Sequence, residues 1–157
     1  MLVAKGYFDQ QGNPCLKISL CGIFNSDGIE FEAIIDTGFT GFISVPLIRA
    51  FPIGLPLYGT TNVIFADGSS GSKLTAVGII AIGDRRESGI VILEENVSDV
   101  LIGMDFLRTF KASLVMTKDS IVLLEHDWLE QITKTEQNTA SKQIDQSNPA
   151  QAPKPKS

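Results

Sequence analysis

The chain reads Ala-Ile-Ile-Asp-Thr-Gly-Phe-Thr-Gly at residues 33–41. Three apolar residues lead directly to Asp36, and glycines follow it at positions 38 and 41. This pattern is typical of a buried strand that breaks into a tight turn. A carboxylate at such a place is costly unless neighbouring groups hold it. Asp36 is therefore a candidate functional residue, although an aspartate can also stabilise a turn through its own backbone alone.

The residues on either side of this stretch alternate with period two. Apolar and polar residues alternate at 16–20 and at 29–33, and the turn-forming run Asn-Ser-Asp-Gly lies between them at 25–28. This predicts a β-hairpin whose second strand runs into Asp36. The same criteria predict further strands at 42–45, 62–66, 72–82, 89–93, 100–102, 112–116 and 120–124. Their number and close spacing favour an all-β barrel or sandwich.

Helix is scarce in this pattern. Short helices are expected at 46–51, opened by Pro46, and at 105–110, capped by Asp105. An aspartate and a glutamate at 127 and 130 resemble a capping box for one last turn.

The composition changes near residue 131. Residues 131–157 contain no aromatic residue and carry four lysines against two acids, so the remainder of the chain holds a net charge of -7. Such a polar stretch cannot bury enough apolar surface to offset the entropy of ordering it. We therefore expect one folded domain at 1–130 and a disordered polar tail at 131–157.

Composition and charge argue against several classes of function. A net charge of -5 over 157 residues disfavours a nucleic-acid surface. The longest uncharged stretch, 50–66, is interrupted by prolines and glycines and is too short to span a membrane, so a cytoplasmic location is expected. Cys15 and Cys21 lie too far apart on one strand for a disulfide, and with the single His126 they offer too few ligands for a zinc site. No metal or other cofactor is expected.

The order of these motifs resembles the retropepsin-like aspartic proteases, and most closely their bacterial single-domain branch. The resemblance covers about 16–124 and rests on the Asp36-Thr37-Gly38 turn, a later hairpin with a polar tip, and Val-Leu-Ile-Gly-Met-Asp-Phe-Leu at 100–107 before a short helix. It implies a closed all-β barrel of the acid-protease fold with one or two short helices. It also implies a flap over the substrate at the hairpin tip, formed by Asp67, Gly68, Ser69, Ser70 and Gly71.

The resemblance implies aspartic endopeptidase activity on a polypeptide substrate, with Asp36, Thr37 and Gly38 as the catalytic residues. Peptide hydrolysis by carboxyls alone needs one carboxylate to deprotonate a water and one protonated carboxyl to polarise the carbonyl. The chain carries a single Asp-Thr-Gly motif. A homodimer is therefore expected, in which each subunit contributes one Asp36. The Thr37 hydroxyl would bond across the interface, and Gly38 would let backbone approach the carboxylates.

Two positions differ from the family pattern and keep a second function open. Phe39 stands where the family usually has Ala or Ser, and Met104 stands where many retroviral members have Arg. A dimeric barrel that binds peptides or proteins without cleaving them is the alternative. Asp-x-Gly-x-Thr at 36–40 also fits the phosphate loop of the actin and sugar-kinase superfamily, but that fold needs two larger domains with several helices. Asp105 is interpreted as a helix cap, and His126 as a surface residue.

Overall fold

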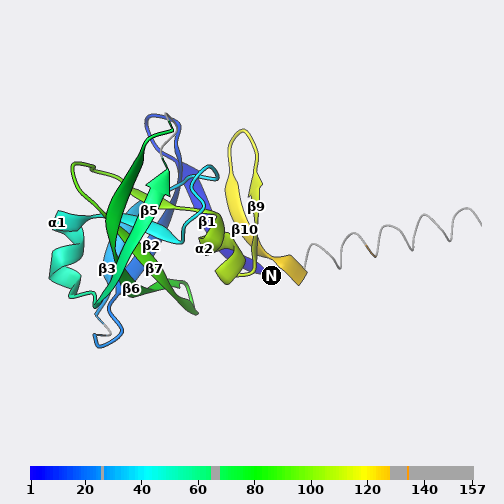
Figure 1. Ribbon diagram of the computed structural model, residues 1–157. Coiled ribbons are helices and arrows are strands. Elements are labelled where there is room, and N and C mark those ends of the chain that lie inside the picture. The colour runs from blue at the N-terminus through cyan, green and yellow to red at the C-terminus, as the bar shows by residue number, and fades with distance from the viewer. Residues whose placement is uncertain (26, 65–67, 128–133, 135–157) are drawn as a thin grey trace, which may run out of the picture. The chain divides into compact units, whose positions relative to one another are not determined.

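A computed structural model describes residues 1–25, 27–64, 68–127 and 134 (Figure 1). The chain divides into two units, Met1–Glu125 and His126–Ser157. Of the tail predicted at 131–157, all but residue 134 lies outside the described residues. His126 and Asp127 are both helical, so Asp127 does not itself precede a helix as a cap, and the remainder of the predicted last turn is not described.

Strands make up most of the regular secondary structure of the first unit. Their bounds, with those of the helices, are β1 Leu2–Phe8, β2 Pro14–Cys21, β3 Ile29–Ile35, β4 Ile43–Pro46, α1 Leu47–Ala50, η1 (a 3-10 helix) Phe51–Ile53, β5 Leu57–Ile64, β6 Ser70–Ile82, β7 Arg85–Glu94, β8 Val100–Ile102, α2 Met104–Thr109, β9 Ala112–Met116 and β10 Ile121–Glu125.

Six of these strands close into a barrel, as the sequence predicted. β2 pairs with β3, β3 with β8, β8 with β4, β4 with β7, β7 with β6, and β6 returns to pair with β2. The β3–β8 and β4–β7 pairs are parallel, and the other four are antiparallel. An all-β barrel with short helices contradicts the actin-like and sugar-kinase-like alternative.

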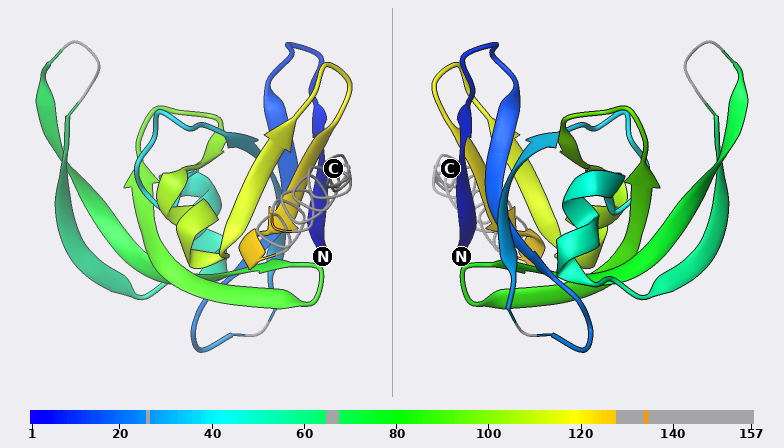
Figure 2. Two further views of the ribbon diagram at one scale, coloured as in Figure 1. Left: turned by 90° about the vertical axis from the view of Figure 1, so that its right-hand side faces the viewer. Right: turned by 90° about the vertical axis from the view of Figure 1, so that its left-hand side faces the viewer.

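The remaining strands extend from the barrel on opposite sides. β5 pairs with the first half of β6 and forms a long hairpin with it. β1 pairs with the first two residues of β2 and with β10, which in turn pairs with β9. Figure 2 shows the strands of the β5–β6 hairpin and of the β9–β10 hairpin at opposite edges of the barrel. β5 and β9 are the two ends of the strand order, so each has one backbone edge that pairs with no other described strand.

The core consists of aliphatic side chains and four phenylalanines, one of which, Phe31, lies on β3. Phe42, Phe106 and Phe110 are almost completely buried. The Phe106 ring centroid lies 5.9 Å from that of Phe42 and 4.6 Å from that of Phe110. Phe42 immediately precedes β4, and Phe106 belongs to α2, so this cluster joins the end of the Asp36 turn to α2.

Predicted and observed elements differ where pairing depends on distant residues. β8 and β9 have the predicted bounds, but β5 begins five residues before, and β7 four residues before, the predicted starts. Both strands extend toward the N-terminus beyond their predicted starts, because these additional residues pair with β6. β1 was not predicted: its burial does not alternate, and most of its residues pair with β10 at the far end of the folded unit. The first helix is also shorter than expected, because Pro46 is its N-cap and a 3-10 turn follows Ala50.

The described part of the chain contains no helix that is long and apolar enough to cross a membrane. Cys15 and Cys21 are both buried on β2, and neither is in a disulfide.

Candidate active site

The Asp36 turn begins where the parallel β3–β8 pair ends. Ile35 lies opposite Ile102 in that pair, and the backbone N–H of Asp36 donates to the Ile102 carbonyl at 2.9 Å. The strand pairing therefore positions Asp36 itself. Asp36 is half-buried, whereas Thr37 and Gly38 are exposed at the surface of the subunit.

The Asp36 carboxylate is held by the turn that follows it. Oδ1 accepts a hydrogen bond from the Gly38 N–H at 2.9 Å, and the Asp36 carbonyl accepts one from the Phe39 N–H at 3.1 Å. The aspartate thus stabilises its own turn, as the simpler interpretation of the sequence requires. Among the described residues the carboxylate forms no ion pair, so its second oxygen remains available for another group.

The loop after Asp36 is fastened to the β8–α2 junction by backbone hydrogen bonds. The N–H of Gly103 donates to the Phe42 carbonyl at 3.3 Å, and the N–H of Met104 donates to the Phe39 carbonyl at 2.8 Å. The N–H of Asp105 donates to the carbonyls of residues 40 and 41 at 3.2 and 3.3 Å. Two of the three features that carried the family resemblance, the Asp36 turn and the segment 100–107, are therefore in direct contact.

The prediction that Asp105 caps α2 is wrong. The N-cap is Gly103, whose carbonyl accepts the first helical bond from Leu107 at 3.4 Å, and Asp105 lies in the first turn. The N–H groups at the start of this helix are satisfied by carbonyls of the Asp36 loop, so no side-chain cap is needed. The Asp105 side chain is exposed, and its negative charge suits the N-terminal end of a helix.

Gly103 permits the close approach of the two segments. A Cβ atom at this position would overlap the carbonyl oxygens of Phe39 and Gly41, and neither can move without displacing the Asp36 loop. We expect Gly103→Ala to lower the free energy of unfolding by about 2 kcal/mol, the usual cost of overpacking a close contact. Urea denaturation followed by circular dichroism measures this change. Unaltered stability of Gly103→Ala would show that the two segments are not packed as described.

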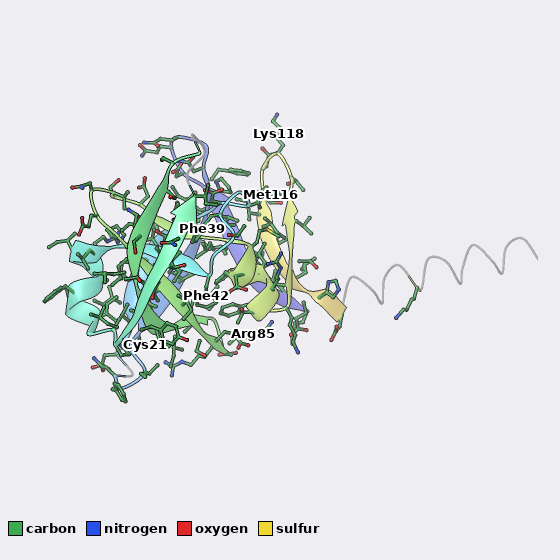
Figure 3. All side chains as sticks on the ribbon, viewed as in Figure 1. Cys21, Phe39, Phe42, Arg85, Met116 and Lys118 are labelled. Atoms are coloured by element: carbon green, nitrogen blue, oxygen red, sulfur yellow. The ribbon has the colours of Figure 1, made fainter. Side chains whose placement is uncertain are left out.

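Phe39 occupies its position because glycines face its ring. A Cβ at Gly41 would lie 2.5 Å from Phe39 Cζ, and one at Gly103 would lie 2.6 Å from Phe39 Cδ1. The side chain is half-buried. Figure 3 labels Phe39 near β5, above Phe42 in that view, and Phe39 lines the same cavity as residues 61–64 of β5. The ring therefore forms an apolar wall next to the Asp36 turn, and it offers no hydroxyl to the carboxylate.

The hairpin predicted as the flap is formed by β5 and β6. Residues 57–64 pair with 70–76 in antiparallel register, with an irregularity near Gly59. Ser70 and Gly71, predicted in the polar tip, already belong to β6 and lie opposite Ile64 and Val63. Gly68, with φ of +82°, and Ser69 precede the strand, while Asp67 lies outside the described residues.

A cavity of about 560 Å³ lies between the Asp36 loop and this hairpin. Its walls come from four segments: residues 38–42, residues 61–64 of β5, Ile90 and Ile92 of β7, and Asp105 of α2. Ile90 and Ile92 lie in a strand that the sequence predicted, but no sequence pattern marked them as residues of a site. Only the parallel β4–β7 pairing brings this part of β7 beside the Asp36 loop, and no local pattern encodes it.

Metal-ligating side chains do not cluster in the described ranges, where no group of three or more His, Cys, Asp or Glu residues is close enough to hold an ion. Met104 is half-buried and packs against the core.

Comparison with known proteins identifies the architecture. No protein-family model and no curated protein matches the sequence. Among solved structures, the chain is similar to the crystal structure of a retropepsin-like aspartic protease from Rickettsia conorii, with a TM-score of 0.50 and 20% sequence identity. The alignment covers 76% of this chain and 87% of that one. The closed β-barrel that carries the Asp36 turn therefore has the retropepsin-like fold.

Proposed function

We propose that the chain is an aspartic endopeptidase that works as a homodimer. The observation that carries the proposal is the exposed Asp36 turn, fastened to the β8–α2 junction beside a cavity, in a barrel of retropepsin-like fold. Asp36 of each subunit would contribute one carboxyl to a shared dyad.

The chemistry requires two carboxyls in different protonation states. Two carboxyls about 3 Å apart cannot both ionise, so such a pair shares one proton and titrates as a unit. The ionised member takes a proton from a water molecule, which attacks the peptide carbonyl, while the protonated member donates a hydrogen bond to the carbonyl oxygen. Both roles fall to Asp36, because one chain carries one Asp-Thr-Gly motif.

The surroundings of Asp36 support an interface at this turn. Thr37 and Gly38 are exposed, so a second copy can approach the carboxylate without steric obstruction from either residue. In the proposed dimer the Thr37 hydroxyl bonds across the two-fold axis. Met104, at the position where many relatives have an arginine, contributes apolar packing in place of an ion pair.

The β5–β6 hairpin is proposed as the flap that closes over an extended peptide. One backbone edge of β5 pairs with no other strand in the described part of the chain, and this edge would form main-chain hydrogen bonds with a substrate strand. Closing the hairpin would exclude bulk water from the dyad.

We expect the purified full chain to form a dimer in solution. Because each subunit supplies half of the dyad, the dimer should appear at the protein concentrations at which cleavage is observed. Sedimentation velocity across a concentration series measures this association. A monomer that cleaves peptides throughout that series would contradict the shared dyad.

The proposed activity is tested by incubating the full chain with a diverse peptide library from pH 3 to pH 8. Mass spectrometry should detect internal cleavage products, because an endopeptidase cuts within the chain. Binding of extended peptides without any cleavage would instead support the non-catalytic alternative that the unusual residue Phe39 leaves open.

A further inference from the structure

We propose that the cavity beside the Asp36 turn selects a lysine or arginine side chain of the substrate, with Asp105 as the residue that determines this specificity. The inference rests on the proposed function, since it names the kind of polypeptide that the same site would take.

The cavity lies close enough to Asp36 to receive a side chain near the scissile bond. Gly38 lines the cavity, and its N–H is also the donor that holds Asp36 Oδ1 at 2.9 Å. An extended peptide advances about 3.3 Å per residue. A peptide with its scissile bond at the dyad would therefore place a side chain within about two residues of that bond into the cavity.

The walls of the cavity suit an aliphatic stem. Val63 and Ile64 line it from β5, Ile90 and Ile92 line it from β7, and Phe39 lines it from the Asp36 loop. Ile64 is 77% exposed and Ile90 is 36% exposed, so both offer apolar surface that a ligand could cover. The long methylene chains of lysine and arginine cover apolar surface of this kind while their charged ends remain near polar groups.

Asp105 supplies the group that would bind the charged end. Among the described residues that line the cavity it is the only charged one, and its side chain is exposed. Its backbone N–H is already bonded to the loop carbonyls. Among the described residues no cation forms an ion pair with its carboxylate. One negative charge with apolar walls is complementary to a basic side chain and disfavours an acidic one.

The test compares two peptides that differ only in the residue placed in the cavity, lysine in one and norleucine in the other. Norleucine keeps the aliphatic stem and removes the charge. At low ionic strength we expect wild type to cleave the lysine peptide with a kcat/KM about tenfold higher than the norleucine peptide. The factor is modest because Asp105 is exposed and its interactions are screened by water and salt.

Asp105→Asn removes the charge with almost no change in volume, and it should reduce the lysine-to-norleucine ratio to about one. Asp119→Asn is the matched control, because this exposed aspartate precedes β10 and does not line the cavity. It should keep the wild-type ratio. Equal cleavage of both peptides by wild type, or an unchanged ratio in Asp105→Asn, would overturn the specificity proposal and leave the protease function intact.

The two proposals fail in different ways. If wild type cleaves neither these two peptides nor any member of the diverse library, the protease function is contradicted. Fluorescence anisotropy then measures the binding of the two labelled peptides to the full chain, and this binding decides the specificity. Preferential binding of the lysine peptide that Asp105→Asn abolishes would support the Asp105 site. Equal binding of the two peptides, or binding of neither, would overturn it.

Discussion

Asp36→Asn is expected to lower kcat/KM for peptide cleavage by about four orders of magnitude or more. The substitution removes the ionisable group from both halves of the dyad, so the general base and the general acid are lost together. Each of these roles is worth about 10²–10⁴ in rate. The measurement is cleavage of the best library peptide by equal concentrations of the variant and wild type.

The fold should survive this substitution, so a loss of activity can be assigned to chemistry. Asparagine has nearly the volume of aspartate, and its side-chain oxygen can still accept the Gly38 N–H hydrogen bond. Circular dichroism and sedimentation should therefore match those of wild type. Wild-type cleavage by Asp36→Asn would contradict the assignment. So would complete loss of cleavage of all peptides in Asp105→Asn with its fold intact.

Phe106→Ala is expected to lower the free energy of unfolding by about 3–5 kcal/mol. The Phe106 side chain is 0% exposed and stacks against Phe42 and Phe110, so truncation would leave a cavity between α2 and the barrel. The variant should also show lower cleavage, because Phe42 and α2 hold the two ends of the Asp36 loop. Urea denaturation at a fixed protein concentration measures the change, since association adds to the stability of a dimer.

Phe51→Ala is the matched control for this experiment. Phe51 is 81% exposed in the 3-10 turn after α1, so the same truncation there should change the free energy of unfolding by less than about 0.5 kcal/mol. A similar loss in both variants would show that the Phe42–Phe106–Phe110 cluster is not the core that holds the Asp36 loop.

The turn around Asp36 could be predicted from sequence because every signal in it is local. An apolar strand, an acid and two nearby glycines lie within nine residues, and the structure places Asp36 directly after β3. β8 and β9 were predicted with their observed bounds for the same reason. The closed barrel was predicted because the order of the motifs along the chain resembles that of the retropepsin-like proteases. Local pattern and motif order thus predicted the fold class and the catalytic candidate.

Asp105 shows why local rules fail next to this site. Aspartate is a favoured N-cap, yet the N-cap of α2 is Gly103, because the carbonyls of the Asp36 loop already satisfy the first N–H groups of the helix. Those carbonyls come from residues more than sixty positions earlier in the chain. A rule based on neighbouring residues cannot include such partners.

The sequence by itself determined an all-β chain with one Asp-Thr-Gly turn, because period-two alternation and turn residues act over a few positions. Only the tertiary structure decided what surrounds that turn. The β3–β8 pairing joins Asp36 to Ile102, and the β4–β7 pairing brings Ile90 and Ile92 beside the Asp36 loop. Parallel strands pair only through long connections, so residues far apart in the chain together form the cavity and place Asp105 in its wall.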